Sequence, residues 1–265
     1  MFDAVSLVAL QERFVVGGLF FVRITAMLTT APFFDNAAVK VQTRIGLGVL
    51  LAMMMTTSFG NQQPPIQFDL IAISVIVLKE IAVGTIIGFV MNLMMMSARF
   101  AGSLADVELG FQTGAAFNLN IESSAILGEL FALMSLMIFV LLNGHHALIE
   151  TLFVSAKLIP LTQFHLPSDA MQSIVRAITI MLILGAKMGA PLLIALFITN
   201  LALALMSRVA PQINIFQLSY NVKTIVGLVL LMLTVPLIGA LARHSLEVFQ
   251  QETMRVLMSI AHHPA

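Results

Sequence analysis

The chain has 265 residues, of which 59% are hydrophobic and 10% are charged, and its formal net charge is zero. Soluble domains carry about 25% charged residues, so this composition excludes an ordinary water-soluble globule, and the charge balance gives no case for nucleic-acid binding. The sequence contains no cysteine, which excludes both a disulfide framework and a thiolate metal site.

Apolar runs with the length of a membrane span follow one another along the chain. A span needs roughly 17–25 predominantly apolar residues. In chain order the candidate runs are Phe14–Phe34, Ala125–Leu142, Ile174–Met206 and Thr224–Ala242. Leu70–Ser97 is longer than one span and is interrupted by Lys79 and Glu80. Ile174–Met206 is long enough for two spans, whereas Ile45–Phe59 has the length of a core helix or half-span.

These runs are rich in Leu, Ile, Met and Ala, which apart from Ile are good helix formers. We therefore predict an all-α fold, a polytopic membrane-associated chain of seven or more helical segments. Polar connectors are expected to include Arg99–Ser124, Lys157–Arg176 and the residues from Arg243 onward. The first segment should be retained, because Asp3 comes early and no basic residue precedes Arg13, the reverse of a signal peptide. Basic residues occur at nearly every junction, which leaves the topology open.

The helices are interrupted by prolines and contain paired glycines. Each proline removes an amide donor and bends or ends a helix, and the prolines in or beside apolar runs are Pro32, Pro160, Pro191, Pro211 and Pro236. Gly84 lies four residues before Gly88, and Gly185 four before Gly189. Small residues at this spacing let helix backbones approach closely, and tight packing within a bundle is the simplest interpretation.

Charged side chains lie deep within apolar sequence at Lys79, Glu80, Arg99 and Lys187. A charge that faces hydrocarbon is costly, so each should face protein or water. Three interpretations remain open: functional groups on a transport path, ion pairs between subunits, and helices that are not embedded in lipid in the usual way.

Catalytic signatures are absent from the sequence. It contains no GxSxG, HExxH, Walker A or GxGxxG motif. Adjacent His145 and His146 are poorly placed to bind one metal from the same helix face, and Glu150 is the nearest further ligand type. We expect a chain that is not an enzyme and that has no cofactor and no metal site.

The segment Ala101–Ser124 differs from the other connectors. It contains three glycines and two phenylalanines, Phe111 and Phe117. Irregular backbone within a membrane protein is tolerated only where it is buried in protein or lines water. A solvent-exposed loop is the common alternative, but phenylalanine is unusual at a loop tip in water. A movable constriction is the hypothesis that accounts for both the glycines and the aromatic pair.

A second polar stretch, Met206–Val226, separates two apolar runs and contains the sequence RVAPQINIF at Arg208–Phe216, followed by Lys223. This stretch resembles the FliR family of flagellar export proteins and the related SctT proteins of virulence secretion. Further segments agree with the resemblance and together extend it over nearly the whole chain: Arg23-Ile24, Lys79-Glu80-Ile81 with Gly84 and Gly88, Ala101-Gly102 with Gly110-Phe111, and Leu142–His146. The Asn-Gly-His-His element is closer to flagellar members.

The resemblance implies a core subunit of the flagellar type III protein export gate, part of the channel through which unfolded flagellar proteins cross the bacterial inner membrane at the flagellar basal body. The implied partners are FliP, FliQ, FlhB and FlhA-type export subunits, unfolded export substrates and membrane lipids. It also implies a FliP-like part, 1–175, followed by a FliQ-like helical hairpin within 176–265. Lys187 and Pro191 match the FliQ pattern well, and the turn near Gln212 matches it loosely.

Two sets of candidate functional residues follow from the resemblance. The first set would form a plug or constriction across the channel within Asp106–Glu122, and its members are Asp106, Glu108, Gly110, Phe111, Gly114, Phe117, Asn118 and Asn120. The second set would contact neighbouring subunits, and its members are Lys79, Glu80, Lys187, Arg208, Pro211, Gln212, Asn214, Phe216 and Lys223.

Three alternative functions remain open. A virulence-type SctT homologue would share most of these features. A small-molecule secondary transporter would also have broken helices and intramembrane charge, although the two halves show no convincing inverted repeat. A pure assembly scaffold would need no gating loop.

Overall fold

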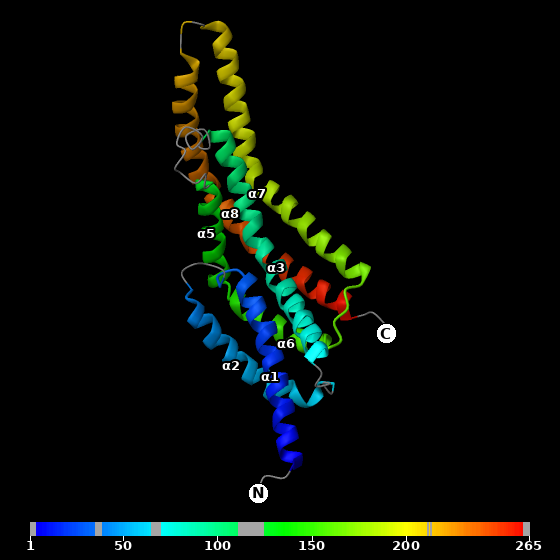
Figure 1. Ribbon diagram of the computed structural model, residues 1–265. Helices are drawn as coiled ribbons and strands as arrows, with labels where there is room; N and C mark the ends of the chain where they lie inside the picture. Colours follow the sequence, from blue (N-terminus) through cyan, green and yellow to red (C-terminus); the bar gives the residue numbers. More distant parts are fainter. Residues whose placement is uncertain are drawn as a thin grey trace. The chain divides into compact units, whose positions relative to one another are not determined.

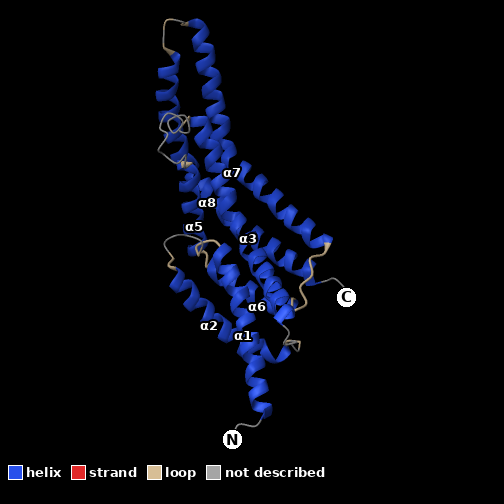
Figure 2. Ribbon diagram, in the orientation of Figure 1, coloured by secondary structure: helices blue, strands red, loops and turns tan. Residues whose placement is uncertain are grey.

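The computed structural model describes residues 4–34, 39–64, 70–110, 125–210, 212 and 214–261. Throughout these ranges the regular structure is helical, and no strand occurs in them (Figures 1 and 2). In chain order the elements are α1 (Ala4–Thr30), α2 (Val41–Phe59), the 3-10 turn η1 (Gly60–Gln62), α3 (Leu70–Leu109), α5 (Ile126–Leu141), α6 (Gly144–Leu158), α7 (Ser168–Val209) and α8 (Ile215–Ala261). The predicted all-α fold is confirmed.

Among the described residues, four helices are long and apolar enough to cross a membrane. The candidate spans are Arg13–Thr30, Ile71–Leu109, Ser168–Val209 and Gln217–Ala261. Helices α5 and α6, broken between Leu141 and Gly144, add a fifth if they count as one span. The break falls at Asn143, whose backbone adopts the left-handed conformation with φ 58°. The chain is therefore a polytopic membrane protein, as predicted.

Three stretches that were predicted to be connectors are helical in part: Arg99–Leu109 within α3, Lys157–Leu158 and Ser168–Arg176 at the ends of α6 and α7, and Arg243–Ala261 within α8. Helix α3 continues past Arg99 to Leu109, because Ala101, Ala105 and Leu109 recur every fourth residue and are buried. Helix α8 likewise continues past Arg243 to Ala261. Its polar residues there alternate with a buried apolar stripe at helical spacing, formed by Leu246, Phe249, Val256, Leu257 and Ile260.

The prolines act in two ways. Pro32 and Pro160 follow the ends of α1 and α6, as expected for residues that cannot continue a helix. Pro191 and Pro236 lie inside α7 and α8, which are helical on both sides of them. At these two positions the proline therefore does not end the helix. Pro211 lies outside the described residues.

The chain forms two compact units. The first consists of Met1–Leu93, Asn143–Ala177 and Val248–Ala265, and the second of Met94–Leu142 and Ile178–Glu247. Helices α3, α7 and α8 each contribute to both units.

In the first unit α1 packs against both α2 and the N-terminal part of α3. A β-carbon at Gly84 would overlap the carbonyl oxygen of Arg23, so the α3 backbone touches the α1 backbone there. Gly88 repeats this contact one turn later against Thr30. Helix α2 contacts α6 through the rings of Phe59 and Phe153, whose centroids are 6.0 Å apart. The predicted tight packing of the Gly84–Gly88 pair is confirmed.

A buried ion pair crosses this α1–α3 contact. Arg23 of α1 and Glu80 of α3 are both fully buried, and Arg23 Nε donates to Glu80 Oε2 at 2.5 Å. The guanidinium also donates to Ser155 Oγ at 3.3 Å and to the carbonyl oxygen of Ile159 at 3.0 Å. One arginine therefore joins α1, α3 and the end of α6.

Two side chains near this ion pair bond to the turn that follows α6. Lys79 Nζ donates to the carbonyl oxygen of Thr162 at 3.0 Å, and the Leu161 amide donates to Gln63 Oε1 at 2.8 Å. Thr162 has a positive φ of 80°, an uncommon conformation for a β-branched residue. Side chains from two other segments thus hold the turn at 159–163 in place.

In the second unit α3, α5, α7 and α8 share one apolar core. Its buried members are Ala105, Leu109, Leu127, Leu192 and Leu196, against which Leu230 and Leu231 of α8 pack. Gly185 of α7 lies against the backbone of Ser97, and Gly227 of α8 against Leu109. The upper parts of α7 (yellow) and α8 (orange) run in opposite directions and meet at the turn near Gln212 (Figure 1).

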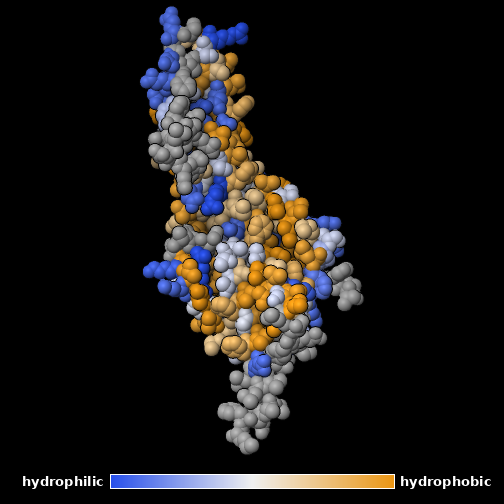
Figure 3. All heavy atoms as spheres, in the orientation of Figure 1, coloured by the Kyte–Doolittle hydropathy of each residue, from blue (hydrophilic) through white to orange (hydrophobic). Residues whose placement is uncertain are grey.

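Many large apolar side chains remain on the surface of this second unit. On α7 they include Phe197, which is 65% exposed, and on α8 Met232, which is 75% exposed. Apolar residues are visible over α7 in the space-filling view (Figure 3). Such a surface needs lipid or other protein to cover it.

We predict that Arg23→Leu destabilises the protein by about 3–5 kcal/mol, because it leaves the Glu80 carboxylate buried without its partner. Denaturant titration of the full chain in detergent, together with its steady-state amount in membranes, measures the effect. The double variant Arg23→Leu/Glu80→Leu should recover most of the loss, since apolar replacement of a whole buried pair is often nearly neutral.

The matched control is Arg99→Leu. Arg99 pairs with Glu129 at 3.3 Å, but their side chains are 52% and 57% exposed, so its loss should cost only about 0–1 kcal/mol. Equal destabilisation by Arg23→Leu and Arg99→Leu would show that the buried pair has no special role.

Candidate functional site

The predicted constriction, Asp106–Glu122, begins in the last turn of α3, and residues 110–125 separate α3 from α5 in the sequence. Helix α3 ends at Leu109, and Gly110 follows with φ 79°. A glycine adopts this left-handed conformation without steric cost, which suits it to end a helix. The candidates Asp106, Glu108 and Gly110 are described, whereas Phe111, Gly114, Phe117, Asn118 and Asn120 lie outside the described residues.

Asp106 joins the two ends of this loop. Its side chain is fully buried, and its carboxylate accepts from the Leu127 amide at 3.0 and 3.1 Å and from the Gly128 amide at 3.1 Å. These amides belong to the first turn of α5, whose N–H groups have no partner within the helix. The preceding Ala125 provides no side-chain cap, so Asp106 of α3 caps α5 instead. A carboxylate is also favoured there by the helix dipole.

Two glycines bring the backbones of α3 and α5 together beside Asp106. A β-carbon at Gly102 would overlap the carbonyl oxygen of Leu127, and one at Gly128 would lie 3.1 Å from the carbonyl oxygen of Arg99. Residues larger than glycine would separate the helices and move the α5 amides away from Asp106. The two glycines therefore make the cap possible.

Further polar contacts are made at the loop base, by which we mean the C-terminal end of α3, the first turn of α5 and the part of α7 packed against them. Glu108 Oε2 accepts from Asn200 Nδ2 at 3.0 Å, which links α3 to α7. Arg99 and Glu129 form the exposed ion pair between α3 and α5. Together with the leucine core, these contacts hold the end of α3 and the start of α5 together with α7 in the second unit. This arrangement of described residues is suited to hold the two ends of a loop in position.

The predicted subunit-interface residues fall into several environments. Glu80 is enclosed by its own chain and pairs with Arg23, and Lys79 is half-buried beside Thr162. Lys223 is half-buried as well. The exposed members are Lys187, Arg208, Gln212 and Asn214.

Asn214 has a structural role of its own. Its Oδ1 accepts from the Gln217 amide at 3.4 Å, and its carbonyl oxygen accepts from the Leu218 amide at 3.1 Å. Asparagine is among the favoured residues at this position before a helix, and Asn214 thus caps the start of α8. Pro211 and the side chain of Phe216 lie outside what the structure describes.

No group of three or more His, Asp or Glu side chains suited to a metal ion occurs in the described residues. His145 and His146 lie next to each other at the start of α6, with ring centroids 4.4 Å apart.

Three residues important to these sites were not singled out as functional candidates by sequence reasoning. Arg23 carried a signal, because an arginine inside an apolar span predicts a buried partner. For Gly102 and Gly128 the sequence signal was weaker: each is a glycine within sequence that otherwise favours a helix. The sequence separation of 21 residues between Asp106 and its amide partner Leu127 hid the cap.

The chain matches the family model described as bacterial export proteins, family 1, over residues 14–249. It belongs to this family. Among its relatives is the flagellar biosynthetic protein FliR of Pectobacterium carotovorum subsp. carotovorum, 30% identical over 84% of this chain and 85% of the relative. FliR of Bacillus subtilis is 28% identical over 91% and 94%, respectively.

A relative that is named as a translocation protein also matches this bacterial export protein. The Yop proteins translocation protein T of Yersinia pestis is 29% identical over 72% of this chain and 74% of the relative. The predicted FliR family is confirmed, and with it the predicted function in flagellar-type protein export. The family is one of structural components of the export apparatus.

We predict that Asp106→Ala destabilises the export protein by about 1–2 kcal/mol, as expected for loss of a helix cap. The effect should be local, so the 111–124 segment should become more sensitive to added protease. Limited proteolysis followed by peptide mass mapping measures it.

Glu129→Ala is the control, because it removes an exposed partner at the same α3–α5 contact. Its cleavage pattern should match that of the unmodified protein. Identical cleavage rates in the Asp106 and Glu129 variants would contradict a capping role for Asp106.

Proposed function

We propose that this chain is a non-enzymatic subunit of the flagellar export gate in the bacterial inner membrane. It would form part of the channel through which unfolded flagellar proteins leave the cytoplasm, together with FliP, FliQ, FlhB and FlhA-type subunits. The flagellar assignment is supported by the FliR relatives, whose alignments cover 84% and 91% of the chain, compared with 72% for the Yop proteins translocation protein T of Yersinia pestis.

The observation that carries the channel proposal is the loop base on α3, α5 and α7. Asp106 and the adjacent glycines hold the end of α3 close to the start of α5, and residues 111–124 lie between these two helices in the sequence. The sequence of this segment supplies Phe111 and Phe117, with Gly110 and Gly114 as hinge positions. At rest the segment would seal the lumen with apolar side chains, and an entering polypeptide would displace it. The anchored base would return it afterwards.

The interface proposal is supported by the surface of the second unit. Apolar side chains on α7 and α8 are exposed beside the cations Lys187 and Arg208. Neighbouring export subunits would cover this surface, which accounts for both its hydrophobicity and its charge. The division into a FliP-like part, 1–175, and a FliQ-like part, 176–265, belongs to the same proposal.

We expect deletion of residues 112–121 to make the membrane leak ions, since the seal is lost while Asp106 and the α5 cap remain. Ion conductance in cells that carry the assembled gate measures the leak. Replacement of the same ten positions by a Gly/Ser sequence should leak similarly, because it keeps the length but removes Phe117. Membranes as tight as wild type, with export unchanged, would contradict the plug.

We expect Arg208→Ala/Lys223→Ala to reduce co-purification with FliP and FliQ, because Arg208 in the last turn of α7 and Lys223 in the N-terminal part of α8 would bond to groups of neighbouring subunits. Affinity purification from membranes with quantification of each subunit tests this. Arg243→Ala is the control, an exposed cation farther along α8. If the double variant assembles as well as Arg243→Ala, these cations do not bind neighbouring subunits.

Co-expression distinguishes the secondary-transporter alternative. A transporter should accumulate stably by itself, whereas a gate subunit should be degraded when its partners are absent.

A further inference from the structure

Two cations of the first unit hold the turn that follows α6. Arg23 of α1 donates to the Ile159 carbonyl oxygen at 3.0 Å, and Lys79 of α3 donates to the Thr162 carbonyl oxygen at 3.0 Å. Both bonds end on the main chain, so they fix the course of the backbone through 159–162. A main-chain carbonyl carries no net charge, however, so neither bond neutralises the cation that makes it.

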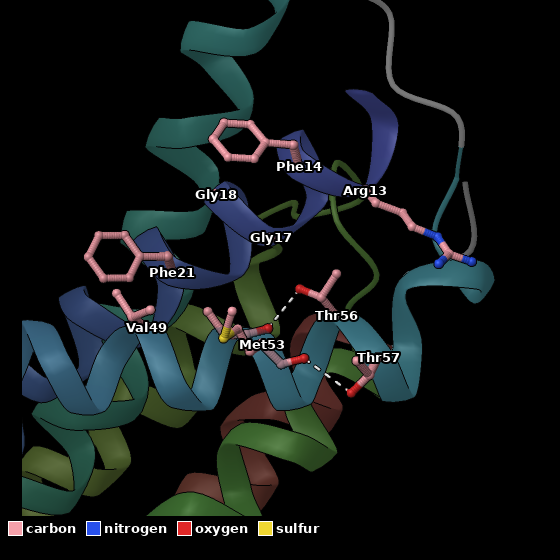
Figure 4. A pocket seen from close by; sticks show the side chains of 10 residues that line it. Arg13, Phe14, Gly17, Gly18, Phe21, Val49, Met53, Thr56 and Thr57 are labelled. Atoms are coloured by element: carbon pink, nitrogen blue, oxygen red, sulfur yellow. Dashed lines mark hydrogen bonds between the residues drawn. The ribbon is translucent and has the colours of Figure 1, made fainter. Parts of the chain in front are cut away.

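The bonds at this turn differ from those made by the threonines of α2. In the apolar groove that α1 and α2 form beside Gly17 and Gly18, Thr56 and Thr57 donate to carbonyl oxygens of α2 itself, at 2.7 and 3.1 Å (Figure 4). Such bonds are kept when α2 moves as a whole. The bonds at the turn join separate segments, so they are lost when those segments separate.

Glu80 supplies the negative charge beside the two cations. Its carboxylate pairs with Arg23 at 2.5 Å, and both side chains are fully buried. Lys79 precedes Glu80 on the same helix. Within the described part of the chain, no other carboxylate forms an ion pair with Arg23 or Lys79. A guanidinium keeps its proton in proteins, so a proton on Glu80 would leave two cations at one turn without a counter-charge.

The other titratable groups close to the turn in sequence have different neighbours. Lys157 of α6 lies over the Phe59 ring, with Nζ 5.7 Å from its centroid. His165 Nδ1 is 3.1 Å from the Gln163 carbonyl oxygen. Both side chains are exposed. The charge balance inside the turn therefore depends on the protonation state of Glu80.

The backbone of the turn is strained. Thr162 has φ 80°, a conformation in which the β-carbon of an L-residue crowds the backbone. Strained backbone persists only where the surrounding contacts enforce it. Loss of the bonds from Arg23 and Lys79 would therefore let the turn move away instead of leaving it in place.

We propose that the turn at 159–163 is a latch that the charge of Glu80 keeps closed and that a proton on Glu80 opens. In the closed form Arg23 is paired, and both cations hold the turn. In the open form a proton from solvent occupies the carboxylate, Thr162 relaxes, and the connector 159–167 reaches water. Ionisable residues inside membrane helices commonly mark functional steps, proton transfer among them. The latch belongs to the first unit and does not depend on the proposed plug.

Glu80→Gln tests the latch, because glutamine has the shape of the protonated acid and no charge. Hydrogen exchange of the full-length protein in its membrane assembly, followed by peptide mass spectrometry, measures opening in the peptide 159–167. After correction for the intrinsic exchange rate, the wild type should exchange about tenfold or more faster at about pH 5 than at about pH 8. Glu80→Gln should exchange at the fast rate at both pH values. Glu129→Gln, which removes an exposed paired carboxylate, should keep the wild-type response.

Thr162→Gly tests the strain in the opposite direction. Glycine adopts a positive φ without steric cost, so this variant should close the latch more firmly and slow exchange at about pH 8 by about fivefold. The control is Gln163→Gly, because Gln163 is exposed and is not among the described residues with a positive φ. There the added freedom of the unfolded backbone should speed exchange.

Three results would overturn the proposal. Equal exchange of 159–167 at both pH values in the wild type would show that no proton controls the turn. Fast exchange in Glu80→Gln that extends to the first turn of α5 would show general unfolding in place of a local opening. Faster exchange in Thr162→Gly would show that the closed turn is not strained. If Glu80→Gln does not accumulate, the wild-type pH comparison and Thr162→Gly decide. None of these outcomes depends on whether deletion of 112–121 causes an ion leak.

Discussion

The structure depends on one constraint: a polar group buried among apolar helices must find its partner within reach. The free-energy cost of burying an unpaired charge is much larger than the free energy that a single contact contributes. Arg23 meets this constraint by bonding to a carboxylate, a hydroxyl and a backbone carbonyl from three segments. Because all of these partners are required at once, the ion pair determines how α1, α3 and the end of α6 pack.

The same constraint explains the loop base. The first amides of α5 need an acceptor, and the side chain of Ala125 does not supply one. Asp106 supplies it from a different helix, and Gly102 and Gly128 allow the close approach that this requires. In both units, then, a glycine contact between helix backbones lies beside a buried carboxylate that bonds across the contact. Close packing and polar satisfaction are achieved by the same few residues.

Features that depend on neighbouring residues were predictable from the sequence, whereas features that depend on contacts between distant residues were not. Apolar runs such as Thr224–Ala242 are local signals, and the helices they predicted are present. Helix ends were harder, because the buried stripes through Ala101–Leu109 and Leu246–Ile260 keep α3 and α8 helical through sequence that looks polar. Lys79 and Glu80 were recognised as charges that must face protein or water. Their partners come from distant sequence positions: Lys79 bonds to the Thr162 carbonyl, and Glu80 pairs with Arg23.

The sequence by itself determined the helical class, the membrane character and the family. These follow from residue composition and short motifs, which do not depend on tertiary contacts. Only the tertiary structure decided which groups meet. Glu80 lies 57 residues from Arg23, and Ser155 a further 75 positions beyond Glu80. The groove between α1 and α2 is likewise visible only once two glycines of one helix face the side chains of another. Local hydrophobicity dictates that a helix forms, but the choice of neighbours depends on shape and polar complementarity across the whole chain.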